Sequence, residues 1–171
     1  MLRTPAALLL CLLAVADSSA VTDAHCVRFD GIGPARVGMT LPELNRALHT
    51  SYAIPTAKSD DDPSCFYVDY PRQPQVVLMI LNGRVARTDV NNNTTQTAEG
   101  IRNGNSEDSA IRAYGKRLMI EPHHYMPENG HYLTVYSANK KYGIRFETED
   151  GKITSYYAGT TEAIGYIEGC S

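Results

Sequence analysis

The chain has 171 residues, of which 43% are hydrophobic and 20% are charged. This balance is typical of a globular protein and excludes disordered, collagenous and multi-span membrane classes. The 16 Lys and Arg residues are outnumbered by 19 Asp and Glu residues, which leaves a net charge of −3. Because nucleic-acid binding depends on a basic surface, we expect no nucleic-acid partner.

Residues 1–20 have the pattern of a secretory signal peptide. Arg3 supplies a charged start, an apolar stretch follows, and small residues at Ser18 and Ala20 suit cleavage after Ala20. The apolar stretch is shorter than the roughly 20 residues that a membrane-spanning helix needs. We therefore expect a mature chain that has no membrane span and is periplasmic or secreted.

Cleavage after Ala20 would leave three cysteines, Cys26, Cys65 and Cys170. In an oxidising compartment they predict one disulfide and one remaining thiol, and three pairings are open. We favour Cys65 with Cys170, because Cys65 opens a predicted strand and a crosslink at Cys170 would hold that end of the chain against fraying. The pairing of Cys26 with Cys170, or with Cys65, remains an alternative.

Two short capped helices indicate an internal repeat. Thr40 and Glu43 form a capping box before the apolar face of residues 41–48. Sixty-six residues after Thr40, Ser106 occupies the capping position of a second helix over 107–114. Helices of about eight residues are marginal alone, so each must pack on a sheet.

The strand pattern repeats as well. Strands are predicted over 65–70, 76–81 and 84–90 in the first half, and over 131–136, 144–149 and 152–157 in the second. Asn82-Gly83 and Asp150-Gly151 separate the last two strands of each set, and these dipeptides favour tight hairpin turns. The polar stretch 91–97 between the halves predicts an exposed linker.

We therefore predict an α+β fold of two pseudo-repeated units, each a short capped helix packed on about three to four antiparallel strands. The first unit covers 21–97, including the polar linker, and the second covers 98–171. The segment Val37-Gly38-Met39-Thr40 before the first helix, partly echoed by residues 103–106, resembles the β-lactamase-inhibitory protein and the outer-membrane assembly lipoproteins of the SmpA/OmlA type. This resemblance implies a concave sheet or an exposed edge that binds another protein, and no catalysis. The chain lacks the lipid-attachment cysteine of these lipoproteins and the inhibitor's one disulfide per repeat, so no binding residue is carried over.

One cluster could carry metal or acid–base chemistry: His123, His124 and His131, beside Glu121 and Glu128. Its spacing fits no zinc pattern, and Pro122, Pro127 and Asn129-Gly130 predict a loop over 121–131. No catalytic residue, metal site or cofactor is therefore predicted. A small periplasmic or secreted metal-binding protein, or a hydrolase using these histidines, remains an alternative function.

Tyrosine is the compositional excess, with 11 Tyr, 3 Phe and no Trp. Tyr132 and Tyr136 share one face of a strand, whereas Tyr156 and Tyr157 must point to opposite faces. Tyrosine is enriched at interfaces, although it also fills small cores. We predict an exported, non-enzymatic binding protein, such as an inhibitor, an immunity-like protein or an envelope adaptor. Its partner would be another envelope or extracellular protein, and a carbohydrate-binding module is a further alternative. The predicted binding residues are His123, His124, Tyr125, His131, Tyr132 and Tyr136.

Overall fold

The computed structural model describes residues 26–56 and 62–170. The predicted signal peptide over 1–20 lies outside the described residues. Within them the structure has two short α-helices and two antiparallel sheets, which confirms the α+β class. No helix in this described part of the chain is long and apolar enough to cross a membrane.

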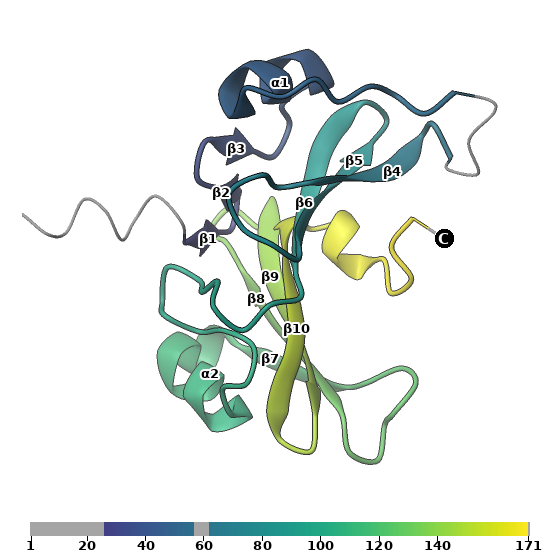
Figure 1. Cartoon of the computed structure of the whole chain (residues 1–171). Helices are drawn as coiled ribbons and strands as arrows, with labels where there is room; N and C mark the ends of the chain where they lie inside the picture. Colours follow the sequence, from purple (N-terminus) through teal and green to yellow (C-terminus); the bar gives the residue numbers. More distant parts are fainter. Residues whose placement is uncertain (1–25, 57–61, 171) are drawn as a thin grey trace, which may run out of the picture.

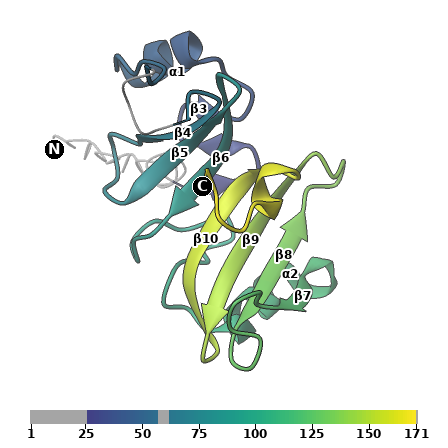
Figure 2. The ribbon, with the colours of Figure 1, turned by 90° about the vertical axis from the view of Figure 1, so that its right-hand side faces the viewer.

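The larger sheet has seven antiparallel strands in the order β4-β5-β6-β10-β9-β8-β7 (Figures 1 and 2). In chain order these are β4 (Cys65–Asp69), β5 (Val76–Leu81), β6 (Arg84–Val90), β7 (Met119–Pro122), β8 (His131–Tyr136), β9 (Tyr142–Glu149) and β10 (Lys152–Thr160). The smaller sheet joins β1 (Val27–Arg28), β2 (Gly31–Ile32) and β3 (Ala35–Arg36). The helices are α1 (Leu41–Leu48) and α2 (Glu107–Tyr114), with 3₁₀ turns η2 (Gly115–Arg117) and η3 (Ala163–Gly165).

Both helices begin and end where the sequence predicts. At α1, the Glu43 carboxylate accepts hydrogen bonds from the Thr40 amide and hydroxyl, each at 2.8 Å. At α2, the Ser106 hydroxyl accepts from the Ser109 amide at 3.3 Å. These caps satisfy amide groups that the first turn of a helix leaves without intrahelical partners.

Both predicted hairpins are confirmed. Asn82 and Gly83 have φ values of 50° and 76°, and Asp150 and Gly151 have values of 48° and 72°. Positive φ at both central positions defines the turn type that such dipeptides favour. The strands on either side of each turn pair in antiparallel register.

The two halves contain matching local contacts around these turns. The Leu41 amide donates to the Gly83 carbonyl at 3.2 Å, and the Glu107 amide donates to the Gly151 carbonyl at 3.0 Å. A bulge follows each turn at the same distance along the chain, at Ala86 in β6 and at Thr154 in β10. Each helix start is therefore bonded to the hairpin of its own half in the same way.

One hydrophobic core extends through both halves on the face of the large sheet that carries the helices. It joins Leu44 of α1, Tyr114 of α2 and Ile32 of the small sheet to strand residues such as Leu78 and Phe146. Figure 1 shows α2 and the small sheet on one side of β10 and the C-terminal segment on the other. We call these the helix face and the outer face.

The halves are joined by direct pairing of β6 with β10, in which Val90 lies opposite Tyr156 and Arg87 opposite Gly159. The sequence does not predict this pairing, because antiparallel strands with compatible alternation can pair in many orders. It makes one continuous sheet out of strands from both halves. The predicted division at residue 97 therefore separates segments of the chain that share one core.

The stretch 91–97 is only partly the exposed linker that its polarity predicts: Asn91, Asn93, Thr94 and Gln96 are exposed, but three other side chains are packed into the protein. Asn92, Thr95 and Thr97 are buried. Asn92 Nδ2 donates to the Pro74 carbonyl at 2.7 Å, and the hydroxyl of Tyr114 donates to Thr97 Oγ1 at 2.9 Å. Hydrogen bonds satisfy these polar groups, which is why three polar side chains of this stretch can be buried.

The loop expected over 121–131 is shorter than predicted, because Glu121 and Pro122 belong to β7. This edge strand pairs with β8, so that Pro122 lies opposite His131. Proline has no amide hydrogen and is tolerated on an edge strand, where one side of the backbone needs no partner. The loop therefore begins at His123.

Gly159 is required where β10 approaches the bulge in β6. A Cβ atom at this position would lie 2.2 Å from the Ala86 carbonyl oxygen and 2.7 Å from Arg87 Cα, both backbone atoms. We expect Gly159→Ala to lower the free energy of unfolding in urea by more than about 2 kcal/mol, because the two strands must separate. Gly165→Ala is the matched control, since its Cβ would meet nothing within 4 Å. Equal stability of the two variants would contradict the requirement.

Candidate functional site: a polar pocket on the outer face

The outer face of the sheet carries a row of polar and aromatic side chains. Strand alternation and register place Tyr67 of β4, Arg87 and Asp89 of β6, Tyr157 of β10 and Glu147 of β9 on this face. Tyr156 points the opposite way, into the core, as predicted for neighbouring tyrosines. The row therefore runs across strands of both halves.

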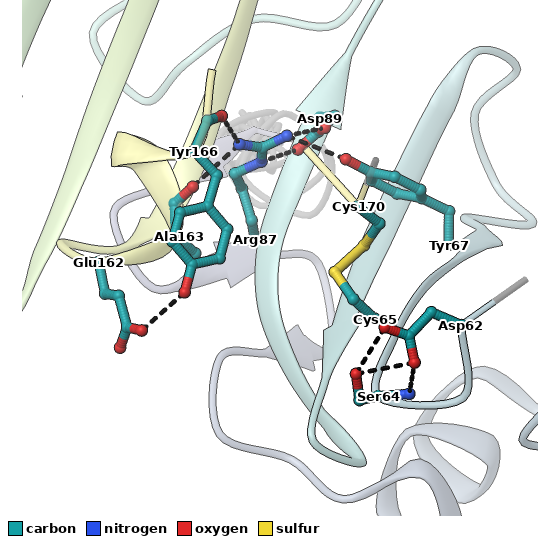
Figure 3. The surroundings of a disulfide bond; sticks show 10 residues. All are labelled: Asp62, Ser64, Cys65, Tyr67, Arg87, Asp89, Glu162, Ala163, Tyr166 and Cys170. Carbon is teal, nitrogen blue, oxygen red and sulfur yellow. Dashed lines mark hydrogen bonds and ion pairs between the residues drawn. A yellow bond between two sulfur atoms is a disulfide. The ribbon is translucent and has the colours of Figure 1, made fainter. Parts of the chain in front are cut away.

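The C-terminal segment folds back over one end of this row (Figure 3). It is crosslinked to the edge strand by the disulfide between Cys65 and Cys170, whose Cα atoms are 5.3 Å apart. This confirms the favoured pairing, while Cys26 is buried at the start of the described chain. A small second hydrophobic cluster lies beneath the segment, with Met79, Ala86 and Ala163 at its centre. The disulfide is consistent with an oxidising environment.

Arg87 connects the sheet to the C-terminal segment. Its guanidinium donates two hydrogen bonds to the Asp89 carboxylate, at 2.7 and 2.8 Å, and one to the Tyr67 hydroxyl at 3.0 Å. The remaining nitrogen, Nη1, donates to the carbonyls of Ala163 and Tyr166, each at 2.9 Å (Figure 3). All five donors of the guanidinium are therefore used.

Arg87 is only 3% exposed, so its charge depends on its partners. Burial by itself lowers its pKa, but the hydrogen bonds and negative charge of Asp89 outweigh burial and raise the pKa above its ordinary value. The guanidinium also lies over the Tyr157 ring, 4.4 Å from its centroid, an attractive arrangement for a cation. The guanidinium therefore stays charged, while burial raises the pKa of the Asp89 carboxyl and the hydrogen bonds and charge of Arg87 oppose that rise.

Glu147 is the second carboxylate of the row. Its Oε1 accepts from the Tyr157 hydroxyl at 3.0 Å, and its Oε2 accepts from the Ser155 hydroxyl at 3.3 Å. Burial and the charge of Glu147 raise the pKa of Tyr157, which keeps that phenol protonated as a donor. His123 Nε2 lies 3.8 Å from Glu147 Oε2, which is too long for a hydrogen bond.

These side chains surround a pocket of about 230 Å³, bounded by Asp89, Glu147, Ser155 and Tyr157 on the sheet and by residues 167–169 of the C-terminal segment. Two large side chains of its lining are exposed, Tyr67 at 38% and Ile167 at 39%, and the neighbouring Tyr125 is exposed at 57%. The Tyr125 hydroxyl donates to Glu168, which links the loop after β7 to the C-terminal segment. The site thus combines a polar interior with an aromatic and apolar rim.

Among the six predicted binding residues, four form a local group. His123 is buried and stacks on Tyr132, with ring centroids 4.5 Å apart, and its Nδ1 accepts from the Tyr125 amide at 3.2 Å. His124 packs edge-on against the Tyr125 ring, 4.8 Å between centroids. His123 and Tyr132 thus support the loop from below, whereas His124 and Tyr125 are exposed.

The remaining predicted residues lie apart from that group. His131 faces the helix side, where its Nδ1 lies 2.9 Å from Glu107 Oε1 of α2. Tyr136 lies on the outer face, further along β8, and is half-buried. His123 and His131 therefore lie near different carboxylates, on opposite faces of the sheet. Within residues 26–56 and 62–170, no three His, Cys, Asp or Glu side chains gather as metal ligands would.

Sequence reasoning missed Arg87, Asp89 and Glu147, the charged centre of the pocket. A signal for the first two exists, because Arg87 and Asp89 are two apart in a strand that is otherwise largely apolar, so both charges point to one face. A charged pair inside such a strand indicates an ion pair within the structure. The hydrogen bonds from Arg87 to the C-terminal segment could not be predicted from the sequence of this strand.

Comparison of the chain with protein-family models, curated proteins and solved structures finds no match. The functional interpretation therefore depends on the geometry of the site.

Proposed function

We propose that this chain is an exported, non-enzymatic binding protein that contacts another envelope or extracellular protein through its outer face. An inhibitor, an immunity-like protein and an envelope adaptor all fit this description. The observation that carries the proposal is a set of three large exposed side chains beside a polar pocket: Tyr67 and Ile167 line it, and Tyr125 is hydrogen-bonded to Glu168 of its lining. Rigid aromatic side chains lose little conformational freedom on binding and dominate many interfaces.

The arrangement of charges in the pocket favours binding over catalysis. Arg87 and Asp89 hold each other, and both oxygens of Glu147 accept hydrogen bonds from neighbouring hydroxyls. The exposed parts of the site are instead side chains suited to contact area.

Export is part of the same proposal. The charged start and short apolar stretch of residues 1–20 support it, and so does the disulfide between Cys65 and Cys170. The two halves are further proposed to be copies of one ancestral unit, related to the fold of the β-lactamase-inhibitory protein and the SmpA/OmlA-type lipoproteins. The matching helix-to-hairpin hydrogen bonds and the equivalent bulges at Ala86 and Thr154 support a duplication.

The test is capture of a partner from the native envelope or extracellular fraction by immobilised protein. We expect Tyr125→Ser combined with Tyr67→Ser to reduce retention of the captured protein at least about tenfold, because tyrosine anchors are often worth 2 kcal/mol or more in an interface. Tyr67→Ser also removes the hydroxyl that accepts a hydrogen bond from Arg87, which could disturb the fold. Tyr125→Ser alone must therefore show part of the loss of retention.

Ile54→Ser is the matched control, because Ile54 is 53% exposed and lies in the segment after α1, away from the pocket. It should retain the partner as well as the parent does. Retention unchanged by the tyrosine substitutions would overturn the proposed surface. If the parent binds a glycan from a broad panel and Tyr125→Ser does not, the ligand of this surface is a carbohydrate and the proposed protein partner is wrong.

A further inference from the structure

A second hollow lies near the other end of the outer face, between η2 and the turn that joins β8 to β9. It encloses about 640 Å³ and is lined by Lys116 and Arg117 of η2, Met119 of β7, Tyr136 of β8, Lys140 of the turn and Thr161 after β10, among others. Its volume is in the range typical of small-molecule sites, roughly 300–1,000 Å³. None of these residues belongs to the pocket described above.

The charge of this hollow is opposite to that of the chain as a whole. Three cationic side chains line it and no carboxylate does, although the net charge is −3. Within the described part of the chain, Lys116 and Lys140 form no ion pair, and Arg117 lies 6.0 Å from the ring centroid of Tyr114. A concave surface with one sign of charge concentrates ligands of the opposite sign.

Backbone hydrogen bonds hold the cationic segments in place. The Lys140 carbonyl accepts from the Thr161 hydroxyl at 2.6 Å, and the Lys140 amide donates to the Ser137 carbonyl at 2.9 Å. Lys140 adopts a φ of 56°, a left-handed conformation that is uncommon for lysine. At η2, the Leu118 amide donates to the Gly115 carbonyl at 3.1 Å. The backbone on both sides of the hollow is therefore fixed by the fold itself.

Apolar and half-apolar side chains supply the wall. Met119 is 49% exposed and Tyr136 is half-buried, so a ligand here would cover hydrocarbon surface that is now in water. A strand from another protein is a poor occupant of the adjacent edge, because β7 has four residues and ends at Pro122, which has no amide hydrogen to donate.

We propose that this hollow binds a small organic anion, in which a phosphate, carboxylate or sulfonate group is attached to an apolar body. The anionic group lies among Lys116, Arg117 and Lys140, and the apolar body lies against Met119 and Tyr136.

Calorimetric titration of the full chain with three probes tests the proposal. 1-Naphthyl phosphate carries both features, 1-naphthol carries only the apolar body, and inorganic phosphate carries only the charge. We expect saturable one-to-one binding of naphthyl phosphate, and at least about tenfold weaker binding of the other two, since each lacks one set of contacts. Binding should weaken as salt is raised.

Lys116→Gln combined with Lys140→Gln should weaken binding of naphthyl phosphate about tenfold or more. Lys152→Gln is the matched control, because Lys152 is exposed at the start of β10 and does not line the hollow, and it should leave binding unchanged. Equal weakening by Lys152→Gln, equal binding of inorganic phosphate, or no saturable binding would overturn the proposal. Tyr125 does not line the hollow, so Tyr125→Ser should bind naphthyl phosphate as the parent does. The anion titration therefore tests the hollow independently of the proposed protein-binding surface.

Discussion

Replacing Arg87 by methionine is expected to lower the free energy of unfolding by about 3–5 kcal/mol, the usual cost of leaving one member of a buried ion pair alone. The Asp89 carboxylate would lose both charge-assisted hydrogen bonds, and the carbonyls of Ala163 and Tyr166 would lose their shared donor. Methionine keeps an unbranched apolar side chain in the space, so the loss reports chiefly on charge and hydrogen bonds. Urea unfolding under oxidising conditions measures it.

Two further variants show whether the ion pair is the cause. Arg87→Met combined with Asp89→Leu should recover at least half of the loss, because no unpaired charge then remains buried. Arg46→Met, on the exposed side of α1, should change stability by no more than about 0.5 kcal/mol. If Arg87→Met costs less than about 1 kcal/mol, the guanidinium does not connect the sheet to the C-terminal segment as described.

Removal of the disulfide by Cys65→Ala and Cys170→Ala is expected to cost about 3–5 kcal/mol. The two cysteines are 105 residues apart in the chain, and a crosslink that closes so long a loop strongly restricts the unfolded chain. The C-terminal segment would also lose its only covalent attachment to the edge strand β4. Urea unfolding and the rate of limited proteolysis near residue 170 should both report the change.

Cys26→Ala is the control for loss of a cysteine, since it is expected to cost only about 1 kcal/mol as a small buried truncation. Peptide mapping of exported protein without reduction provides the direct check. It should recover Cys65 and Cys170 in one crosslinked species, and alkylation of either residue would count against the pairing.

Local features of the fold were predictable because each depends on residues close together in the chain. Thr40 with Glu43, and Ser106, define helix starts through contacts within one turn. Asn82-Gly83 and Asp150-Gly151 define hairpins because few other residues adopt positive φ at both positions. The strand β7 escaped prediction because Met119–Pro122 is short, exposed and ends in proline, so it lacks the alternation of a half-buried strand.

The candidate site was only partly predictable. The choice of Tyr125 and of the face shared by Tyr132 and Tyr136 followed from composition and strand alternation. Composition and alternation could not show which of the six predicted binding residues are buried and which are exposed. The C-terminal segment and the loop after β7 decide which side chains are covered. Tyr67 and Ile167 line the same pocket although they are a hundred positions apart in the chain, and no local sequence pattern links them.

The sequence by itself determined the two helices, the two hairpins and the mixed fold class, and it favoured the cysteine pairing without deciding it. Each of these depends on neighbouring residues or on a small number of alternatives. Only the tertiary structure decided that β6 pairs with β10, that three side chains of the polar stretch 91–97 are buried, and that Arg87 bonds to the carbonyls of the C-terminal segment. These contacts join segments far apart in the chain, and their free energy depends on the simultaneous packing of a whole sheet face.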